Sequence, residues 1–166
     1  MRRILIIGNA GVGKTTFALK LAEKTGLPLV HLDKIYWRGN WEHLSRGEFD
    51  EALQAELQKE AWIIDGNFSR TLPIRLSHCD GVFYFDFPTV SALWGITKRT
   101  LQHYGKCRSD MGGNCPAYFD KSLYKATATF NKKHRKEYYE LLKNQKNVVI
   151  FKNRKQAETY LKELIG

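Results

Sequence analysis

The residues with the clearest chemical meaning form a glycine-rich loop close to the N-terminus. Residues 8–15 have the sequence GNAGVGKT and fit the pattern Gly-x-x-x-x-Gly-Lys-Ser/Thr. An apolar run typical of a β-strand precedes the loop at 2–7, and a helical pattern follows it at 16–24, closed by Gly26 and Pro28. This order of elements presents backbone N–H groups and the positive end of a helix dipole to a phosphate. The loop therefore predicts a site for a nucleoside triphosphate.

The side chains at the end of this loop have expected roles. Lys14 would reach the outer phosphates, and the Thr15 hydroxyl would ligate Mg²⁺. The residues predicted to bind the nucleotide are Gly8, Ala10, Gly11, Val12, Gly13, Lys14, Thr15 and Thr16. A chance match to the pattern is the alternative, and the flanking strand and helix argue against it.

Carboxylates follow three of the apolar runs. Asp33, Asp65 and Asp86 each come after such a run, and ligands of parallel sheets bind beyond the carboxyl ends of the strands. A carboxylate there can hold a Mg²⁺-bound water or accept a proton from an acceptor hydroxyl, whereas the structural alternative is to cap a turn. We favour catalysis and acceptor binding for Asp33, and Mg²⁺ and acceptor binding for Asp65. Asp86 precedes Pro88 and is interpreted as a turn residue.

The stretch after Asp65 carries further polar candidates. Asn67 lies in the same predicted turn, and Arg70 follows it. An arginine at this place could clamp an acceptor anion through two parallel hydrogen bonds, and the alternative is a solvated surface residue. Asn67 and Arg70 are therefore assigned to acceptor binding, with Arg75 as a further candidate.

Two tryptophans lie in the irregular stretch after Asp33. Trp37 and Trp41 could form a wall of an acceptor pocket, stacking on a base or packing on a sugar. They could equally anchor an irregular loop in the core. The sequence leaves both interpretations open, and Trp37 is assigned to the acceptor site.

Residues 105–120 contain glycine and proline without hydrophobic periodicity and predict a loop or lid. We favour Arg99 and Arg108, which flank or lie in this segment, as catalytic groups. They would stabilise the charge of a transferring phosphoryl group, where one arginine is worth roughly 10³–10⁵ in rate. Asp110 could orient Arg108 through an ion pair, and the alternative for these charges is a solvated face.

Five short apolar runs alternate with helical patterns along the chain. Such alternation predicts an α/β sandwich built on a parallel sheet, and 166 residues fit a single domain. After the first strand and helix, the predicted strands are 29–32, 62–64, 82–85 and 148–151, and the predicted helices are 48–60, 71–78, 88–104, 121–143 and 155–165.

Composition limits the class of protein. With 43% hydrophobic residues and no apolar run approaching ~18 residues, the chain predicts neither a membrane span nor a signal peptide. Cys79, Cys107 and Cys115 lack the spacing of a zinc site and predict unpaired thiols in the cytoplasm.

The net charge of +10 is concentrated in the second half of the chain. Residues 1–83 contain 11 Lys and Arg against 10 Asp and Glu, and residues 84–166 contain 16 against 7. This charge could grip an anionic ligand or lie against nucleic acid. The basic run 132–136 could supply Arg135 to the lid site, bind a nucleic acid backbone, or be solvated.

Several short motifs beyond the loop point to a family. They are residues 31–33 (HLD), 62–67 (WIIDGN), 108–111 (RSDM) and 115–116 (CP). With these, the chain resembles the adenylate-kinase-related P-loop proteins called DNA topology modulation proteins, which are linked to flagellar regulation. The resemblance runs nearly end to end, and beyond residue 143 it rests on pattern only.

The resemblance implies a P-loop NTPase three-layer sandwich of nucleoside-monophosphate-kinase type, with strand order 2-3-1-4-5 and a lid between the fourth and fifth strands. It also implies ATP and Mg²⁺, with Arg99 and Arg108 as lid arginines. Arg70 is similar in place to the arginine that holds the acceptor phosphate in adenylate kinases, although one residue more separates it from Asp65. Asp33 is similar to the aspartate that meets an acceptor hydroxyl in shikimate- and gluconate-type kinases.

The leading hypothesis is a kinase that transfers the γ-phosphoryl group of ATP to an unidentified small-molecule acceptor, a nucleotide or a hydroxyl compound. The alternative is a nucleotide-gated DNA-binding regulator of DNA topology, whose affinity for duplex would fall steeply with salt. The chain has no helix-turn-helix or other base-reading motif to support this alternative. A simple NTPase would need a water-orienting residue that the sequence does not identify. The sequence does not predict an oligomeric state.

Overall fold

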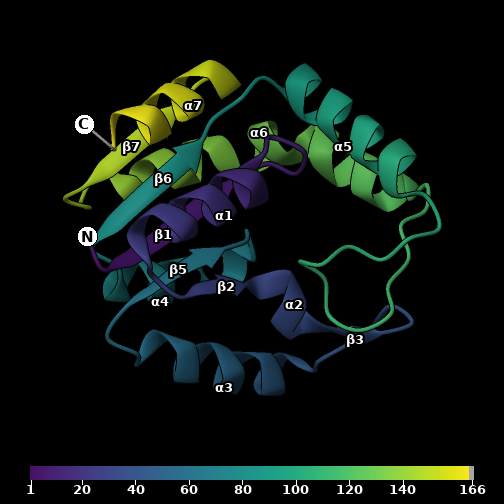
Figure 1. Ribbon diagram of the computed structural model, residues 1–166, viewed down its shortest axis with the longest axis horizontal. Helices are drawn as coiled ribbons and strands as arrows, with labels where there is room; N and C mark the ends of the chain where they lie inside the picture. Colours follow the sequence, from purple (N-terminus) through teal and green to yellow (C-terminus); the bar gives the residue numbers. More distant parts are fainter. Residues whose placement is uncertain (165–166) are drawn as a thin grey trace.

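The computed structural model describes residues 1–164 and contains a five-stranded parallel sheet with helices on both faces (Figure 1). The order of the strands is β2-β5-β1-β6-β7, which is 2-3-1-4-5 when these five strands are numbered along the chain. The predicted strand order is therefore confirmed. The strands are β1 (Arg3–Gly8), β2 (Leu29–His31), β5 (Trp62–Asp65), β6 (Gly81–Phe85) and β7 (Val148–Phe151).

In the described part of the chain, six helices follow the predicted pattern with shifted ends, and a seventh, α2 (Leu32–Tyr36), was not predicted. They are α1 (Lys14–Thr25), α2 (Leu32–Tyr36), α3 (Arg46–Leu57), α4 (Leu72–His78), α5 (Thr89–His103), α6 (Lys121–Leu142) and α7 (Arg154–Glu163). The predicted helix 48–60 begins earlier, because Ser45 and Glu48 form a capping box, in which each side chain accepts a hydrogen bond from the other residue's backbone N–H.

Neighbouring residues of a strand point to opposite faces of the sheet, and helices cover both of these faces. In β1, Leu5 and Ile7 belong to a core cluster shared with α3, α4 and α6, whereas Ile4 and Ile6 belong to a second cluster shared with α1 and α7. Strands buried on both faces need apolar residues at every position. This is why the strand sequences show no alternation.

The region after β2 differs from the prediction. The strand ends at His31, and Asp33 lies in the short helix α2 instead of at the strand end. A two-stranded antiparallel hairpin follows, formed by β3 (Trp37–Gly39) and β4 (Glu42–His43). The sequence did not predict this hairpin, whose turn has Asn40 and Trp41 at positive φ, a conformation that side chains other than glycine seldom adopt.

Residues 104–120 form an irregular segment between α5 and α6, as predicted, with only two isolated bridges at residues 104–117 and 107–116. In Figure 1 this green segment runs from α5 down to β3. Its contact with the hairpin is tight, because a Cβ atom on Gly112 or Gly113 would collide with the carbonyl oxygens of Trp37 and Arg38. Asn40 also donates its backbone N–H to the carbonyl of Asn114, at 2.7 Å.

Among residues 1–164, no helix is long and apolar enough to cross a membrane.

Candidate active site

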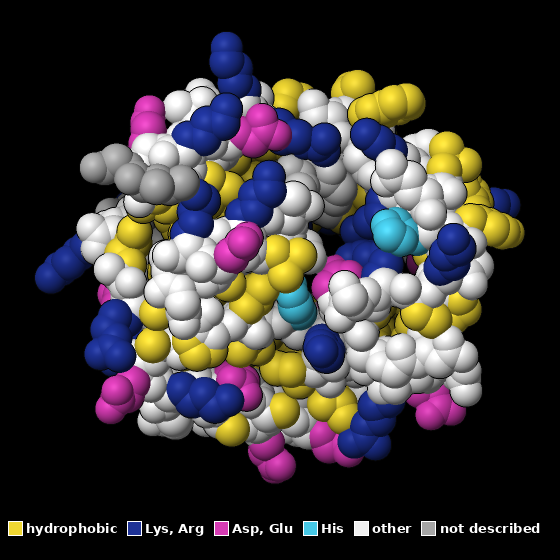
Figure 2. All heavy atoms as spheres, in the orientation of Figure 1, with side chains coloured by type: hydrophobic (Ala, Val, Ile, Leu, Met, Phe, Trp, Pro, Cys, Tyr) yellow, Lys and Arg dark blue, Asp and Glu magenta, His cyan; other side chains and the backbone are white. Residues whose placement is uncertain are grey.

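A cavity of about 1080 Å³ lies at the carboxyl edge of the sheet. It is lined by the glycine loop, α2 and the hairpin, the turn after β5, α5, the 104–120 segment and the start of α7. Figure 2 shows that this face of the molecule is hollowed near its middle, where positive and negative side chains meet. The predicted nucleotide-binding residues Ala10 to Thr16 all line the cavity, whereas Gly8 lies at the end of β1 behind it.

The glycine loop rests directly on α5. Gly11 has a φ of 74°, in the left-handed region, and a Cβ there would strike the backbone of Ala92 and Ile96. On the helix side, a Cβ on Gly95 would strike the Gly11 carbonyl. Since α5 has 3.6 residues per turn, this contact brings the side chain of Arg99, one turn after Gly95, to the loop.

Lys14 lies across the mouth of the loop. Its Nζ donates a hydrogen bond to the Asn9 carbonyl at 2.7 Å. Burial lowers the pKa of Lys14, and the nearby carboxylates of Asp65 and Asp33 oppose that shift. The loop is also tied to α6, because Asn9 Nδ2 donates to the Thr127 carbonyl at 2.9 Å.

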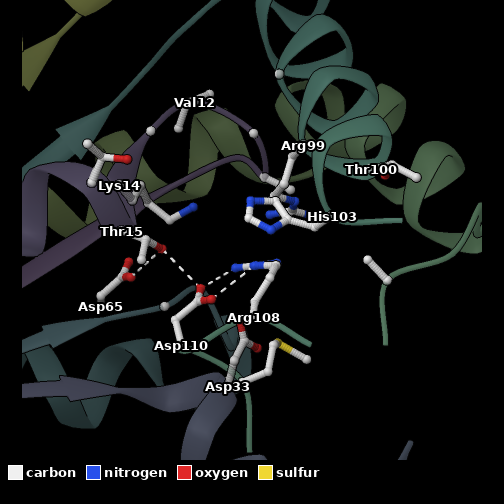
Figure 3. A pocket seen from close by; sticks show the side chains of 18 of the residues that line it. Val12, Lys14, Thr15, Asp33, Asp65, Arg99, Thr100, His103, Arg108 and Asp110 are labelled. Atoms are coloured by element: carbon white, nitrogen blue, oxygen red, sulfur yellow. Dashed lines mark hydrogen bonds and ion pairs between the residues drawn. The ribbon is translucent and has the colours of Figure 1, made fainter. Parts of the chain in front are cut away.

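Thr15 and Asp65 form the part of the site suited to a metal ion. Thr15 Oγ1 donates to Asp65 Oδ2 at 2.8 Å, and His31 Nδ1 lies 3.2 Å from the same oxygen. Asp110 Oδ2 approaches Thr15 Oγ1 at 3.5 Å (Figure 3). Hydroxyl and carboxylate oxygens are ligands that Mg²⁺ prefers, so the donor set fits this ion.

Within residues 1–164, no group of three or more His, Cys, Asp or Glu side chains is arranged to hold a metal ion. Mg²⁺ usually keeps waters and binds through one or two protein groups together with substrate phosphates. Thr15 and Asp65 therefore suit a metal ion that arrives with a nucleotide, and they do not form a complete protein site.

The Asp33 carboxylate lines the cavity next to Arg108 and Asp110 (Figure 3). Burial raises its pKa, and the neighbouring Asp65 raises it further, whereas Arg108 and Lys14 act in the opposite direction. The described residues make no hydrogen bond to the Asp33 carboxylate. A carboxylate with a raised pKa and no partner is suited to accept a proton from a bound hydroxyl.

Two arginines converge on the same space from α5 and the 104–120 segment (Figure 3). Burial lowers the pKa of Arg99 to about 10, and the nearby Arg108 lowers it further. Arg108 Nε donates to Asp110 Oδ1 at 2.9 Å, and its Nη2 donates to Asp110 Oδ2. The ion pair expected between Asp110 and Arg108 is therefore present, and it aims the guanidinium towards the side of Lys14.

The two tryptophans belong to a cavity wall. Trp37 and Trp41 meet edge to face with ring centroids 5.2 Å apart, and Trp41 meets Tyr118 of the 104–120 segment at 5.3 Å. All three side chains line the cavity. Trp37 also packs against Tyr36, so it both lines the pocket and anchors the hairpin.

Arg70 is not brought to the cavity, contrary to its expected place in the acceptor site. Its guanidinium is exposed and binds Asp50 through two hydrogen bonds of 2.9 and 2.6 Å. The pairing arises because α3 places Asp50 beside the turn that carries Arg70, a contact between elements that spacing along the chain does not reveal. Arg70 is absent from the residues that line the cavity.

Arg75 is fully buried and holds the turn after β5. It donates to the carbonyls of Gly66 (2.9 Å), Asn67 and Phe68 (3.2 Å). Asn67 lines the cavity, but its Oδ1 accepts the N–H of Gly8 at 3.0 Å, which connects this turn to the start of the loop. Arg75 therefore positions the turn and does not face the cavity.

Asp86 is not an ordinary turn residue. Its buried carboxylate accepts hydrogen bonds from Arg135 (2.8 Å), Tyr139 (2.7 Å) and Lys152. This network accounts for Arg135, which pairs with Asp86 and does not line the cavity. Arg135 is thus separate from Arg99 and Arg108.

Sequence reasoning assigned no role to three polar residues at the site. His31 contacts Asp65, Asn9 connects the loop to α6, and His103 lines the cavity from α5. The spacing of Gly95, Arg99 and His103 at intervals of four was a usable signal, because such residues share one face of a helix. Asn9 lies within the loop motif and His31 within the motif at residues 31–33, but neither pattern indicated the contacts that these residues make.

The fold is the P-loop α/β fold of the shikimate kinase and nucleoside monophosphate kinase type. It is defined by the strand order, the Gly-x-x-x-x-Gly-Lys-Thr loop at the carboxyl edge and the two layers of helices. Solved shikimate kinases have the same fold. The enzyme from Acinetobacter baumannii, in complex with shikimate, has a TM-score of 0.64 at 16% identity, over 99% of this chain and 91% of that one. The enzymes from Bacteroides thetaiotaomicron and Aquifex aeolicus have TM-scores of 0.58 and 0.57 at 16% and 18% identity, over 98% of this chain and 95% and 94% of theirs.

A family model described as isopentenyl transferase matches residues 1–67, which contain the loop, Asp33 and Asp65. No curated protein matches the chain. These comparisons relate the chain to P-loop kinases through its fold. They do not extend to the narrower resemblance to DNA topology modulation proteins, which rests on the short sequence motifs alone.

Proposed function

We propose that this protein is a kinase that transfers the γ-phosphoryl group of ATP to a hydroxyl group of a small molecule. One observation carries the proposal: Lys14, Arg99 and Arg108 converge in the same cavity as Asp33 and the pair Thr15 and Asp65. Three cations would face the transferring phosphoryl group, and the carboxylate would face its acceptor.

The donor half of the site is the loop and the start of α1. The backbone N–H groups of residues 10–16 would cradle the phosphates of ATP, and Lys14 would leave the Asn9 carbonyl to reach the outer phosphates. Thr15 and Asp65 would hold Mg²⁺ directly or through water. When bound with ATP, this ion neutralises charge on the phosphate oxygens.

The acceptor half lies between Asp33 and the tryptophan wall. An acceptor hydroxyl would donate its proton to the Asp33 carboxylate while its oxygen forms a bond to the γ-phosphorus. The bond between that phosphorus and the bridging oxygen breaks, and ADP leaves. Arg99 and Arg108 would stabilise the negative charge that spreads over the transferring group.

We also propose that residues 105–120 act as the lid of a single kinase domain. Their close packing against the hairpin covers the acceptor side, and Arg108 and Asp110 extend from the same segment to the loop. Closure of this kind excludes water and brings catalytic groups to the substrate together.

The proposal is tested by measuring ATP binding and acceptor-dependent ADP release. Lys14→Ala should weaken ATP binding roughly 10- to 150-fold, because a hydrogen bond to a charged group contributes about 1.5–3 kcal/mol. Lys24→Ala, at the exposed end of the same helix, is the matched control and should bind ATP as the wild type does. Unchanged ATP binding by Lys14→Ala would overturn the proposal, as would a broad acceptor panel in which no compound accelerates ADP release.

The alternative of a DNA-binding regulator has no comparable support. Arg135 and Lys152, which contribute to the basic second half of the chain, are engaged by Asp86. The cations that do converge, Lys14, Arg99 and Arg108, line the cavity.

A further inference from the structure

The acceptor side of the cavity is walled by aromatic and sulfur-containing side chains. Trp37, Trp41 and Tyr118 form a continuous row of rings in edge-to-face contact. Phe68 and Met111 line the same cavity. An aromatic wall of this kind suits a ring-shaped ligand, such as a base or the apolar face of a sugar, which can pack on the face of one of its rings.

The basic residues of the neighbouring elements are unavailable to an anionic acceptor. Arg38 of the hairpin points to Glu48, at 2.8 Å, and is exposed. Arg70 is bound to Asp50 outside the cavity, and the two Nη groups of Arg75 donate to backbone carbonyls. Among residues 1–164, these elements present no unpaired cation to the tryptophan wall.

In the part of the chain that the structure describes, the Lys and Arg side chains that line the cavity come from the loop and α1, α5, the 104–120 segment and α7, and none comes from the hairpin or from the turn after β5. They are Lys14, Lys20, Lys98, Arg99, Arg108 and Arg154. Lys14 comes from the loop, and Arg99 and Arg108 point towards it (Figure 3). The three phosphates of ATP would engage this group. A phosphate or carboxylate on the acceptor would instead meet the negative charges of Asp33 and Asp65, and the Asp65 carboxylate already raises the pKa of Asp33.

A positively charged acceptor is disfavoured as well. Asp110 is bound by Arg108, and Asp65 accepts from Thr15 and contacts His31. Of the three carboxylates of Asp33, Asp65 and Asp110, that of Asp33 makes no side-chain hydrogen bond within the described residues, and the Arg108 guanidinium lies close enough to stabilise its charge. A hydroxyl group fits this carboxylate because it donates a hydrogen bond without adding charge.

We propose that the acceptor is an uncharged ring compound bearing a hydroxyl group, such as a nucleoside or a sugar, bound between the Trp37–Trp41–Tyr118 row and Asp33. This inference rests on the proposed kinase function and specifies the acceptor class within it. It distinguishes the chain from a kinase whose acceptor is a nucleoside monophosphate or a hydroxy acid.

The test is a calorimetric titration of matched compounds, with the loop first saturated by a non-hydrolysable ATP analogue and Mg²⁺. The pairs are adenosine and AMP, ribose and ribose 5-phosphate, and the methyl ester of shikimate and shikimate itself. In the pairs that bind, we expect the neutral member to bind at least tenfold more tightly. The neutral member should also be the one that accelerates ADP release when ATP replaces the analogue.

Two variants check that binding occurs at the aromatic wall. Trp41→Ala should weaken binding of the neutral compound by about 5- to 150-fold, since stacking on one aromatic side chain contributes about 1–3 kcal/mol. Tyr104→Ala is the matched control, because Tyr104 is exposed and does not line the cavity. Equal effects of the two variants would overturn the assignment of the wall.

The outcomes separate this inference from the proposed function. Tighter binding or turnover of the phosphorylated or carboxylated members would overturn the inference and leave a kinase in place. Failure of every neutral compound to bind would also overturn it. The kinase proposal itself is tested by a separate measurement, and it fails if ATP binding does not depend on Lys14.

Discussion

Asp33 shows how one side chain in this site acquires its chemistry from its neighbours. As a free aspartate it would be fully ionised near neutral pH and a weak base. Burial and the charge of Asp65 raise its pKa, while Arg108 and Lys14 limit the shift. A higher pKa makes the carboxylate a better proton acceptor at physiological pH, provided that it remains ionised. Its role as the base of the proposed reaction follows from this environment.

Asp33→Asn removes the proposed base and preserves its shape. We expect acceptor-dependent ADP release to fall roughly 10²–10⁴-fold with ATP binding unchanged. In the wild type, the rate should fall as the pH drops through the pKa of Asp33, at a higher pH than for an ordinary aspartate, because only the ionised form accepts a proton. The measurement is a pH–rate profile of both proteins.

Asp50→Asn is the control for this prediction, because Asp50 lies in an exposed ion pair with Arg70 outside the cavity. It should have the wild-type rate and pH profile. An acidic limb that persists unchanged in Asp33→Asn would assign the titration to another group.

At the scale of elements, the 104–120 segment connects the two halves of the site. Asp110 reaches Thr15 at the loop, and Gly112 and Gly113 pack against the backbone of the β3 hairpin strand. Glycine is required at Gly113 both by its φ of 60° and by the Arg38 carbonyl, which occupies the place of a Cβ. The segment is therefore held by backbone contacts that a side chain would disrupt.

Gly113→Ala should push this segment away from the hairpin. We expect acceptor-dependent turnover to fall by roughly 10²-fold, as small misplacements of catalytic groups can do, with ATP binding retained. Slow ADP release without acceptor should rise, because water would enter the site. Steady-state kinetics with and without acceptor measure both effects.

Gly47→Ala is the matched control, since Gly47 lies in α3 with open space where a Cβ would stand. It should leave both rates unchanged. If Gly113→Ala behaved in the same way, the packing of the segment on the hairpin would not matter for turnover.

At the scale of the whole molecule, Asp86 joins three elements at the carboxyl edge of the sheet, just beyond the end of β6. It follows β6 and accepts hydrogen bonds from Arg135 and Tyr139 of α6 and from Lys152 after β7. Burial would raise the pKa of Asp86, but the hydrogen bonds from Lys152, Tyr139 and Arg135 outweigh it and lower the pKa. The ionised carboxylate is thus preferred in the folded state and stabilises the contact between sheet and helix.

Asp86→Asn should destabilise the fold by roughly 1.5–3 kcal/mol at pH 7, towards the lower figure because Arg135 and Lys152 are half exposed. A lowered pKa in the folded state contributes stability above the ordinary pKa of an aspartate and loses it as the pH falls through the lowered value. The difference in free energy of unfolding between the wild type and Asp86→Asn should therefore be smaller at pH 3 than at pH 7. Urea unfolding at the two pH values measures it, and equal stability at pH 7 would contradict the prediction.

The sequence by itself determined the parts of this protein whose geometry is local. The loop from Gly8 to Thr15 could be recognised because its glycines, lysine and threonine are contiguous, and the flanking strand and helix depend on nearby residues. The sheet could be predicted because strands covered on both faces need uninterrupted apolar runs. These features identified the fold and the phosphate-binding end of the site.

Only the tertiary structure decided which charged side chains share the cavity. From the sequence, Arg99 and Arg108 were favoured as catalytic groups and Arg70 for acceptor binding, with Arg135 as a further candidate. Arg99 and Arg108 reach the cavity, whereas Arg70 and Arg135 are bound elsewhere by Asp50 and Asp86. The irregular hairpin after α2 and the packing of the 104–120 segment against it were likewise not predictable. The physical reason is common to both. The position of a charged side chain and the conformation of an irregular segment depend on partners that are distant in sequence and come close only when the chain packs.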